Sequence, residues 1–475
     1  MTSSPFKAGW SFQRREKIAL TIAMLVLLGF GAILERRTAL RRVPMTDLSV
    51  FAAAAAAVQA GQDVYAATDM HGWHYVYPPA LAILFSPLAF GGPAPAPPLE
   101  PGVVRTPENT PWGYDVKQGG KFYGLHRDNL RFFWIVAVWF LMSVAMTVLS
   151  AHLLACALQG RGWLEPPPAE AVARQLWWRL RWLPALLCIT SIGTEFSRGQ
   201  VDVIMLLAVC AGLYLAAQGW GLMAGMCLSI PAVIKLLPPL ILLLPFWSRR
   251  WRVLYGIALG LALSMVVIPV AKLGVAGTLT AYQNWVTVLV KPGLGGRRDT
   301  TRAQELTNIN STDNQSLLAF IHNWTYHDLP RGRRPAQATP ASRVAALVIG
   351  AAALLAFAGV IGFRRQRSPR ELVIIAGILI GLVFVVSPMV HNYYYLMLLP
   401  LLAGLVDECL DPTSERGLNR RIIGALGFFL LIDLLVRLPG IGSWLRDCGL
   451  PFLTLVALMI AGISVLLRKP VQIKP

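Results

Sequence analysis

The chain alternates between long apolar runs and short polar segments rich in arginine. Many runs approach or exceed the roughly 20 residues that an α-helix needs to cross a bilayer. Apolar residues are continuous within each run, whereas a transmembrane β-barrel needs them to alternate. The pattern predicts apolar helices near residues 17–34, 78–90, 129–155, 182–198, 200–217, 221–247, 251–272, 343–363, 371–388, 392–406, 421–438 and 450–467. We therefore expect an all-α polytopic membrane protein with about twelve transmembrane helices in one membrane-embedded domain, residues 1–475.

Composition agrees with this class and narrows the function. Of the 475 residues, 55% are hydrophobic and 14% are charged, whereas a soluble domain carries about 25% charged residues. The net charge of +19 comes from basic residues between apolar runs, where they orient helices and contact anionic headgroups. No polar stretch is long enough for a folded nucleic-acid module. The six cysteines form no CxxC pair, so we expect neither a zinc site nor a disulfide framework, and no cofactor.

Basic clusters predict the orientation of the helices. Lysines and arginines place both termini inside, together with the turns at 249–252 and 364–370. The first apolar run reads as a retained signal anchor, because Glu35-Arg36-Arg37 follows it instead of a small-residue cleavage site. The segments predicted to face outside are a first loop over 35–77 with a short interfacial helix, a large loop over 273–342, and the turn at 387–391.

Two regions do not follow this simple scheme. The loop 155–181 is rich in arginine and should lie inside, but simple counting of crossings puts it outside. The conflict disappears if 78–90 is re-entrant and 221–247 forms two short crossings, and both segments are short or interrupted by proline. Residues 91–128 form a Pro/Gly-rich insert that reads as an irregular loop.

Polar side chains at the outer ends of the apolar runs are the candidates for chemistry. Asp47 follows the first run, and its alternative role is that of a helix N-cap, which would also fix the carboxylate. Lys235 stands alone among apolar residues beside two prolines, which favours a cavity over simple snorkelling. The polar segment Glu195–Asp202 is either a turn with a Glu195–Arg198 pair or part of a site. His391, beside three tyrosines, is either a satisfied interfacial histidine or a functional one.

Taken in order, short motifs around these residues resemble glycosyltransferase family 87, a family of polyprenyl-phosphate-sugar-dependent C-type membrane glycosyltransferases that includes bacterial mannosyltransferases. The matching pieces are Asp47 with Gly61-Gln62-Asp63-Val64-Tyr65, Tyr77-Pro78-Pro79, Gly199-Gln200-Val201-Asp202, Ile234-Lys235-Leu236-Leu237-Pro238, Asn314-Gln315-Ser316, and Ser387-Pro388 with His391. Each piece is short, and their order makes the set specific. Two departures are Asp202, where the family usually has a small polar residue, and the long 91–128 insert.

The resemblance implies a C-type helical bundle whose outside loops carry the site. It also implies inverting transfer of a hexosyl residue, as in the mannosyltransferases, from a polyprenyl-phosphate sugar to an envelope glycolipid or glycan at the extracytoplasmic face of the plasma membrane. Site residues expected on this basis are Asp47 as general base with His391, then Lys235, Arg198 and Arg42 for the donor phosphate, and Asp63, Tyr77, Gln200, Asp202, Asn314 and Gln315 for substrate. No metal is required. The alternative is a lipid-linked-sugar transporter, flippase or ligase with a similar bundle.

Overall fold

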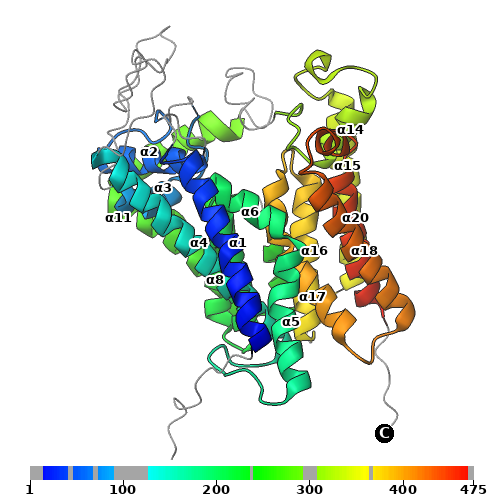
Figure 1. Cartoon of the computed structure of the whole chain (residues 1–475). Helices are drawn as coiled ribbons and strands as arrows, with labels where there is room; N and C mark the ends of the chain where they lie inside the picture. Colours follow the sequence, from blue (N-terminus) through cyan, green and yellow to red (C-terminus); the bar gives the residue numbers. More distant parts are fainter. Residues whose placement is uncertain are drawn as a thin grey trace, which may run out of the picture.

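The computed structural model describes residues 14–40, 46–67, 73–89, 127–235, 239–291, 308–362 and 367–468. The secondary structure in these ranges is helical, with an isolated β-bridge between Asn314 and His391. Seven of the described helical segments are long and apolar enough to span a membrane. The long helices run between the two ends of an elongated bundle, and short helices such as α2 (Asp47–Gln59), α3 (Pro79–Phe85) and α14 (Leu317–Thr325) lie at one end (Figure 1). The predicted all-α polytopic membrane class is confirmed.

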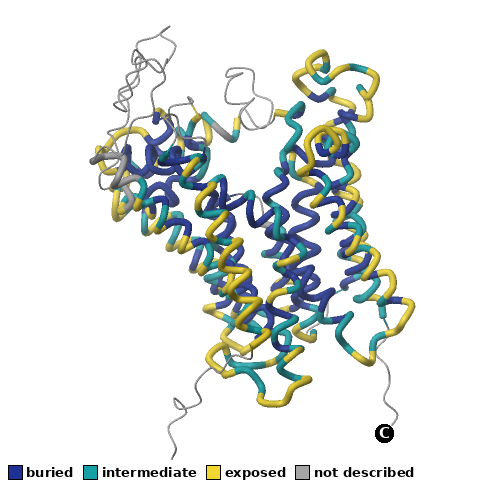
Figure 2. Tube along the Cα trace, in the orientation of Figure 1, coloured by how far each residue is buried: buried dark blue, intermediate teal, exposed yellow. Residues whose placement is uncertain are grey.

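The helices follow the predicted apolar runs closely. Those discussed below are α1 (Arg14–Arg37), α2 (Asp47–Gln59), α3 (Pro79–Phe85), α4 (Arg127–Gln159), α5 (Ala171–Leu187), α6 (Ile189–Arg198), α7 (Asp202–Ala217), α8 (Gly221–Ile234), α9 (Leu243–Trp247), α10 (Trp251–Ala262), α11 (Ile268–Trp285), α14 (Leu317–Thr325), α15 (Pro340–Ile361), α16 (Pro369–Val386), α17 (Leu399–Leu410), α18 (Arg416–Leu435), α19 (Ile441–Asp447) and α20 (Leu450–Leu467). Figure 2 shows α16 buried inside the bundle and α1 exposed along its length. In the most apolar window of each helix, 78% of the α16 residues and 6% of the α1 residues are buried. A helix this apolar and this exposed fits contact with lipid.

One end of the bundle collects the segments predicted to be inside, and we call it the inner end. Arg174, just inside α5, forms an ion pair of 2.8 Å with Glu16 at the start of α1. Tyr214 near the end of α7 accepts a hydrogen bond of 3.1 Å from the Trp163 amide. The arginine-rich loop 155–181 therefore lies at the same end as the beginning of α1, as its charge predicts.

The first short apolar run does not cross the bundle. The seven residues of α3 extend only about 10 Å at the rise of an α-helix, against a hydrocarbon core of about 30 Å. A 3₁₀ turn over Ser86–Ala89 follows, and the Ser86 carbonyl accepts a hydrogen bond of 2.6 Å from the Gln59 side chain at the end of α2. The segment thus stays beside α2 at the opposite end, the outer end, as the re-entrant interpretation expects.

The second irregular run is a hairpin that returns to the inner end. The helix α8 contains Pro231 and ends at Lys235, and α9 leads back towards Arg250. The Arg250 side chain donates a hydrogen bond of 2.9 Å to the carbonyl of Ala216, just before α8 begins. The two feet of the hairpin therefore lie side by side, and Lys235 lies near its tip. This agrees with the predicted split of 221–247.

Three predicted boundaries differ from the structure. The helix α5 begins at Ala171, inside the predicted loop 155–181, and the run 182–198 is broken at Cys188 into α5 and α6. The run expected to end at residue 272 continues instead through α11 to Trp285, with a break in helical geometry at Gly274 (φ +71°). The chain bends there rather than ending the helix, so the predicted loop 273–342 begins inside a helix. Of the 91–128 insert, the structure describes only residues 127 and 128, at the start of α4.

The arrangement predicts which positions a membrane-impermeant thiol reagent can reach from each side. In a background without the six native cysteines, single cysteines at Gln62 and Arg333 should be labelled from outside in intact cells. Cysteines at Glu170 and Thr413 should be labelled only after the membrane is opened. All four positions are exposed. Labelling of the first pair and of the second pair from the same side would contradict the fold.

Candidate active site

Asp47 is the first residue of α2, and Thr46 occupies the N-cap position without a side-chain cap bond. The carboxylate of Asp47 instead accepts a short hydrogen bond from the Gln200 side chain. The alternative N-cap role for Asp47 is therefore not what the structure shows. Burial raises the pKa of Asp47, against the opposing effects of Arg198, Lys235 and the Gln200 hydrogen bond. A carboxylate in this environment is a stronger proton acceptor than one in water.

Gln200 joins three parts of the site. Its Nε2 donates to Asp47 and, at 3.1 Å, to the hydroxyl of Tyr393, and its Oε1 accepts from Lys235 Nζ at 3.3 Å. The preceding Gly199 ends α6 with φ +63°, and a Cβ there would lie 2.9 Å from the Cβ of Leu48. A glycine thus provides both the left-handed turn and the close approach of α6 to the beginning of α2.

Lys235 is held by a buried ion pair. Its ammonium lies 2.5 Å from Asp202 Oδ1, and the two side chains are 3% and 0% exposed. The amide of Asp202 in turn donates to Glu195 Oε1 at 2.9 Å, and the ring of Tyr394 lies 4.6 Å from the ammonium. The unusual acidic residue at 202 therefore supplies the counter-charge for Lys235.

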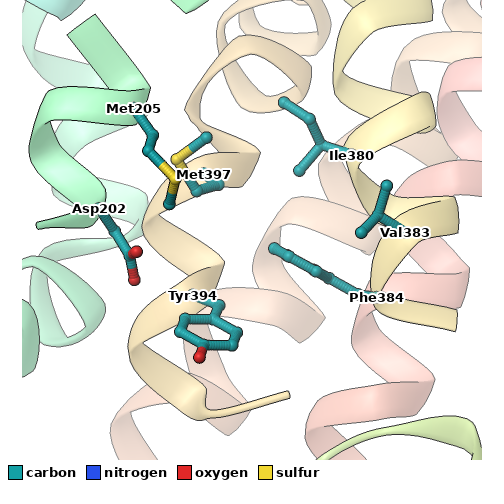
Figure 3. Close-up of a pocket in the computed structure, with 7 residues that line it drawn as sticks. All are labelled: Asp202, Met205, Ile380, Val383, Phe384, Tyr394 and Met397. Carbon is teal, nitrogen blue, oxygen red and sulfur yellow. The ribbon is translucent and has the colours of Figure 1, made fainter. Parts of the chain in front are cut away.

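One side of that pair faces mainly apolar side chains. Figure 3 shows Asp202 and Tyr394 on the wall of a small cavity whose other labelled residues are Met205, Ile380, Val383, Phe384 and Met397. Within the described part of the chain, the second oxygen of Asp202, Oδ2, has no hydrogen-bond partner. In such a setting the two charges depend on each other, because each would be costly to bury alone. Lys235 thus has a structural partner, Asp202, in addition to any contact that Lys235 makes with a substrate.

A polar cavity of about 260 Å³ has Tyr393 as one of its lining residues. We call it the arginine cavity, and its lining residues are Arg37, Thr194, Ser197, Arg198, Asp313, Asn392, Tyr393, Arg437 and Arg446. Asp313 bridges two of its arginines, with 2.7 Å to Arg198 and 3.2 Å to Arg446. The guanidinium of Arg198 also lies 5.1 Å from the centre of the Tyr393 ring. A cavity with four arginines and one carboxylate is suited to an anion.

His391 is placed beside the site by stacking. Its ring lies parallel to that of Tyr393, with centroids 5.0 Å apart and an interplanar angle of 11°. Burial and the nearby charge of Arg198 lower the pKa of His391 to about 3, so the ring is neutral at physiological pH. Its Nδ1 atom is buried without a hydrogen-bond partner. The structure shows a ring that stacks on Tyr393, and a catalytic role for His391 stays a prediction.

The other predicted substrate residues lie at different distances from Lys235 and Asp47. The Tyr77 ring lies 5.5 Å from the ammonium of Lys235, next to the site. Asn314 and Gln315 lie in the neighbouring loop, where Asn314 bonds Val390, Ser316 and Pro388 and Gln315 bonds Thr312 and Arg446. The Asn314 amide thus fixes the loop against the 387–391 turn, and the Gln315 amide joins it to Arg446. Asp63 is exposed and bonds Tyr65 and Asn284 instead, and Arg42 lies outside the described residues.

Several residues of the site carried no clear signal in the sequence. Asp313 stands next to the Asn314-Gln315-Ser316 motif, and Tyr393 belongs to the tyrosine run after His391. Those two could have been chosen from their neighbours. Arg37 and the pair Arg437 and Arg446 look like ordinary charges at helix ends, and only the fold brings them together.

Comparison with known proteins places the chain in a family. No curated protein sequence matches it significantly. The crystal structure of ArnT from Cupriavidus metallidurans bound to undecaprenyl phosphate aligns with 96% of this chain and 77% of its own, at 15% sequence identity and a TM-score of 0.35. The sequence profile of glycosyltransferase family 87 matches residues 75–388, which include Gln200, Asp202 and Lys235 and follow Asp47. That match covers well over half of the chain, which therefore belongs to glycosyltransferase family 87.

Proposed function

We propose that this glycosyltransferase moves a hexosyl residue, with mannose as the candidate sugar, from a polyprenyl-phosphate sugar to a hydroxyl of an envelope glycolipid or glycan. The reaction takes place at the extracytoplasmic end of the bundle, which is the outer end that carries Asp47. The observation that carries the proposal is the Asp47 carboxylate, which accepts a hydrogen bond from Gln200. The same Gln200 amide donates to Tyr393, which lines the arginine cavity.

In the proposed reaction, a proton moves to Asp47 and an electron pair moves to the leaving phosphate. Asp47 takes the proton of the acceptor hydroxyl as its oxygen forms a bond to the anomeric carbon. The bond between that carbon and the phosphate oxygen breaks, and its electron pair stays on the phosphate. Attack from the opposite face inverts the anomeric configuration. Arginines beside the departing oxygen stabilise the developing charge, and Arg198 is the predicted donor-phosphate residue that lines the cavity.

A polyprenyl-linked donor fits a site built between membrane helices. The family resemblance implies this donor, and ArnT, the aligned structure, was solved with undecaprenyl phosphate bound. The lipid chain of such a donor can remain among the helices while its phosphate reaches the outer end. A nucleotide sugar has no lipid chain that would lie among these helices.

The decisive test uses purified protein in proteoliposomes. A radiolabelled polyprenyl-phosphate hexose and a membrane glycolipid extract should yield a labelled glycolipid, and a nucleotide sugar should not replace the donor. The anomeric configuration of the product, read by NMR, should be opposite to that of the donor. Movement of the intact donor across the bilayer without a labelled product would instead support a flippase.

The environment of Asp47 predicts an acid limb in the pH profile. Because burial raises the pKa of Asp47, the base becomes protonated, and kcat/KM falls, as pH drops through a value above that of an ordinary aspartate. The Gln200 hydrogen bond lowers that pKa, so Gln200→Leu should move the limb to higher pH. The exposed Gln283→Leu should leave it in place. If kcat/KM of Gln200→Leu fell at the same pH as in the wild type, the group that titrates would not be Asp47.

A further inference from the structure

The arginine cavity is assembled from distant segments at the outer end. Arg37 ends α1, Arg198 ends α6, and Arg446 lies in α19, shortly after Arg437. Asp313 holds Arg198 and Arg446 with one oxygen each. An aspartate shared by two arginines fixes their separation and leaves further guanidinium N–H groups for another anion.

A second feature of the cavity points to a polar ligand. Asn392 lines it and is 5% exposed, and neither of its amide atoms has a hydrogen-bond partner among the described residues. A buried amide without partners is costly. A bound group with oxygen acceptors would satisfy its Nδ2 donor and the arginines together.

The charge of the donor changes during the proposed transfer. A sugar phosphodiester carries one negative charge, and the polyprenyl monophosphate that leaves carries close to two at neutral pH. Guanidinium groups bind phosphate oxygens in pairs and keep their charge. Several arginines around one phosphate therefore stabilise the product anion more than the donor.

We propose that the arginine cavity is the subsite of the leaving phosphate, that Arg437, Arg446 and Asn392 complete it with Arg198, and that it binds the monoester product more tightly than the diester donor. The inference rests on the proposed function for the identity of the phosphate. Asp313 is a positioning residue, because it acts through Arg198 and Arg446. Tyr393 connects the subsite to the base, since it lies under Arg198 and bonds the Gln200 that bonds Asp47.

The first test measures binding without turnover. The full-length protein in detergent is titrated at pH 8 with a short-chain polyprenyl monophosphate, with its methyl diester, and with the free polyprenol. The monoester should bind on the order of ten times more tightly than the diester, and the alcohol least. Arg446→Gln and Asn392→Ala should reduce this preference, roughly tenfold for the charge-assisted contact of Arg446. The exposed Arg333→Gln is the matched control and should change nothing.

Equal affinity for monoester and diester, or an unchanged preference in Arg446→Gln, would overturn the proposal. Binding of the monoester by a protein that shows no glycosyl transfer would keep the subsite and remove the proposed function. The two ideas can therefore fail separately.

A second test identifies which substrate the phosphate comes from. Polyprenyl monophosphate should inhibit transfer competitively against the donor, and its inhibition constant should rise in Arg446→Gln while that in Arg333→Gln stays at the wild-type value. Competition against the acceptor alone would assign the cavity to an anionic acceptor and overturn the leaving-phosphate assignment.

Asp313→Asn separates positioning from simple charge. The substitution removes a negative charge from the cavity, so electrostatics alone predicts tighter binding of the monoester. If Asp313 positions the two arginines, binding should weaken severalfold, and Asp313→Glu should restore part of it. Tighter binding by Asp313→Asn would refute the positioning role.

Discussion

Replacing Asp47 by asparagine should lower the rate of glycosyl transfer by on the order of 10²–10⁴, the usual contribution of a general base. Asparagine has nearly the same shape and keeps an oxygen for the Gln200 hydrogen bond that the aspartate accepts. Folding should therefore be retained while the proton acceptor is lost. The comparison is of kcat with saturating donor in proteoliposomes, normalised to correctly folded protein by size-exclusion chromatography.

Asp328→Asn provides the matched control, because Asp328 is an exposed carboxylate in the loop after α14. It should transfer sugar at the wild-type rate. If Asp47→Asn were as active as the wild type, the base would have to be another group, and the proposed mechanism would be wrong. A loss of folded protein in Asp47→Asn would instead require Asp47→Ser, judged on the folded fraction alone.

Replacing Lys235 by alanine should destabilise the protein strongly. Asp202 is fully buried and its bonded partner is the ammonium, so the substitution leaves a buried carboxylate with no counter-charge. Breaking such a pair costs about 3–5 kcal/mol, whereas replacing both partners with apolar residues is often neutral. Thermal unfolding in one detergent should show a large fall for Lys235→Ala and recovery in Lys235→Met combined with Asp202→Leu.

The activity of the recovered double variant then reports on the site. Lys235 also donates to Gln200, which bonds Asp47, so a stable double variant should still transfer sugar slowly. A stable double variant with wild-type turnover would make the pair purely structural. Unchanged stability of Lys235→Ala would show that Asp202 is protonated in the folded protein and that the pair is not an ion pair.

The sequence by itself determined the class of the protein and its family, and it predicted an orientation. Continuous apolar runs and arginine-rich turns are local properties of the sequence. An apolar run favours a membrane helix, and a basic turn favours one side of the membrane, without contacts to distant residues. The same holds for the motifs around Asp47, Gln200 and Lys235, whose order along the chain indicated family 87. The conflict over the loop 155–181 was also visible in the sequence, because its charge disagreed with a simple count of crossings.

Only the tertiary structure decided how those residues meet. Asp202 looked like a departure from the family pattern, and the fold makes it the counter-charge of Lys235. Asn314 and Gln315 are predicted substrate residues, and only the fold shows that their side chains also bond Val390 and Thr312 within the protein. The arginine cavity draws on Arg37 and Arg446, near opposite ends of the chain. A cavity formed by distant helix ends leaves no local pattern, because its geometry comes from the packing of the helices that carry it.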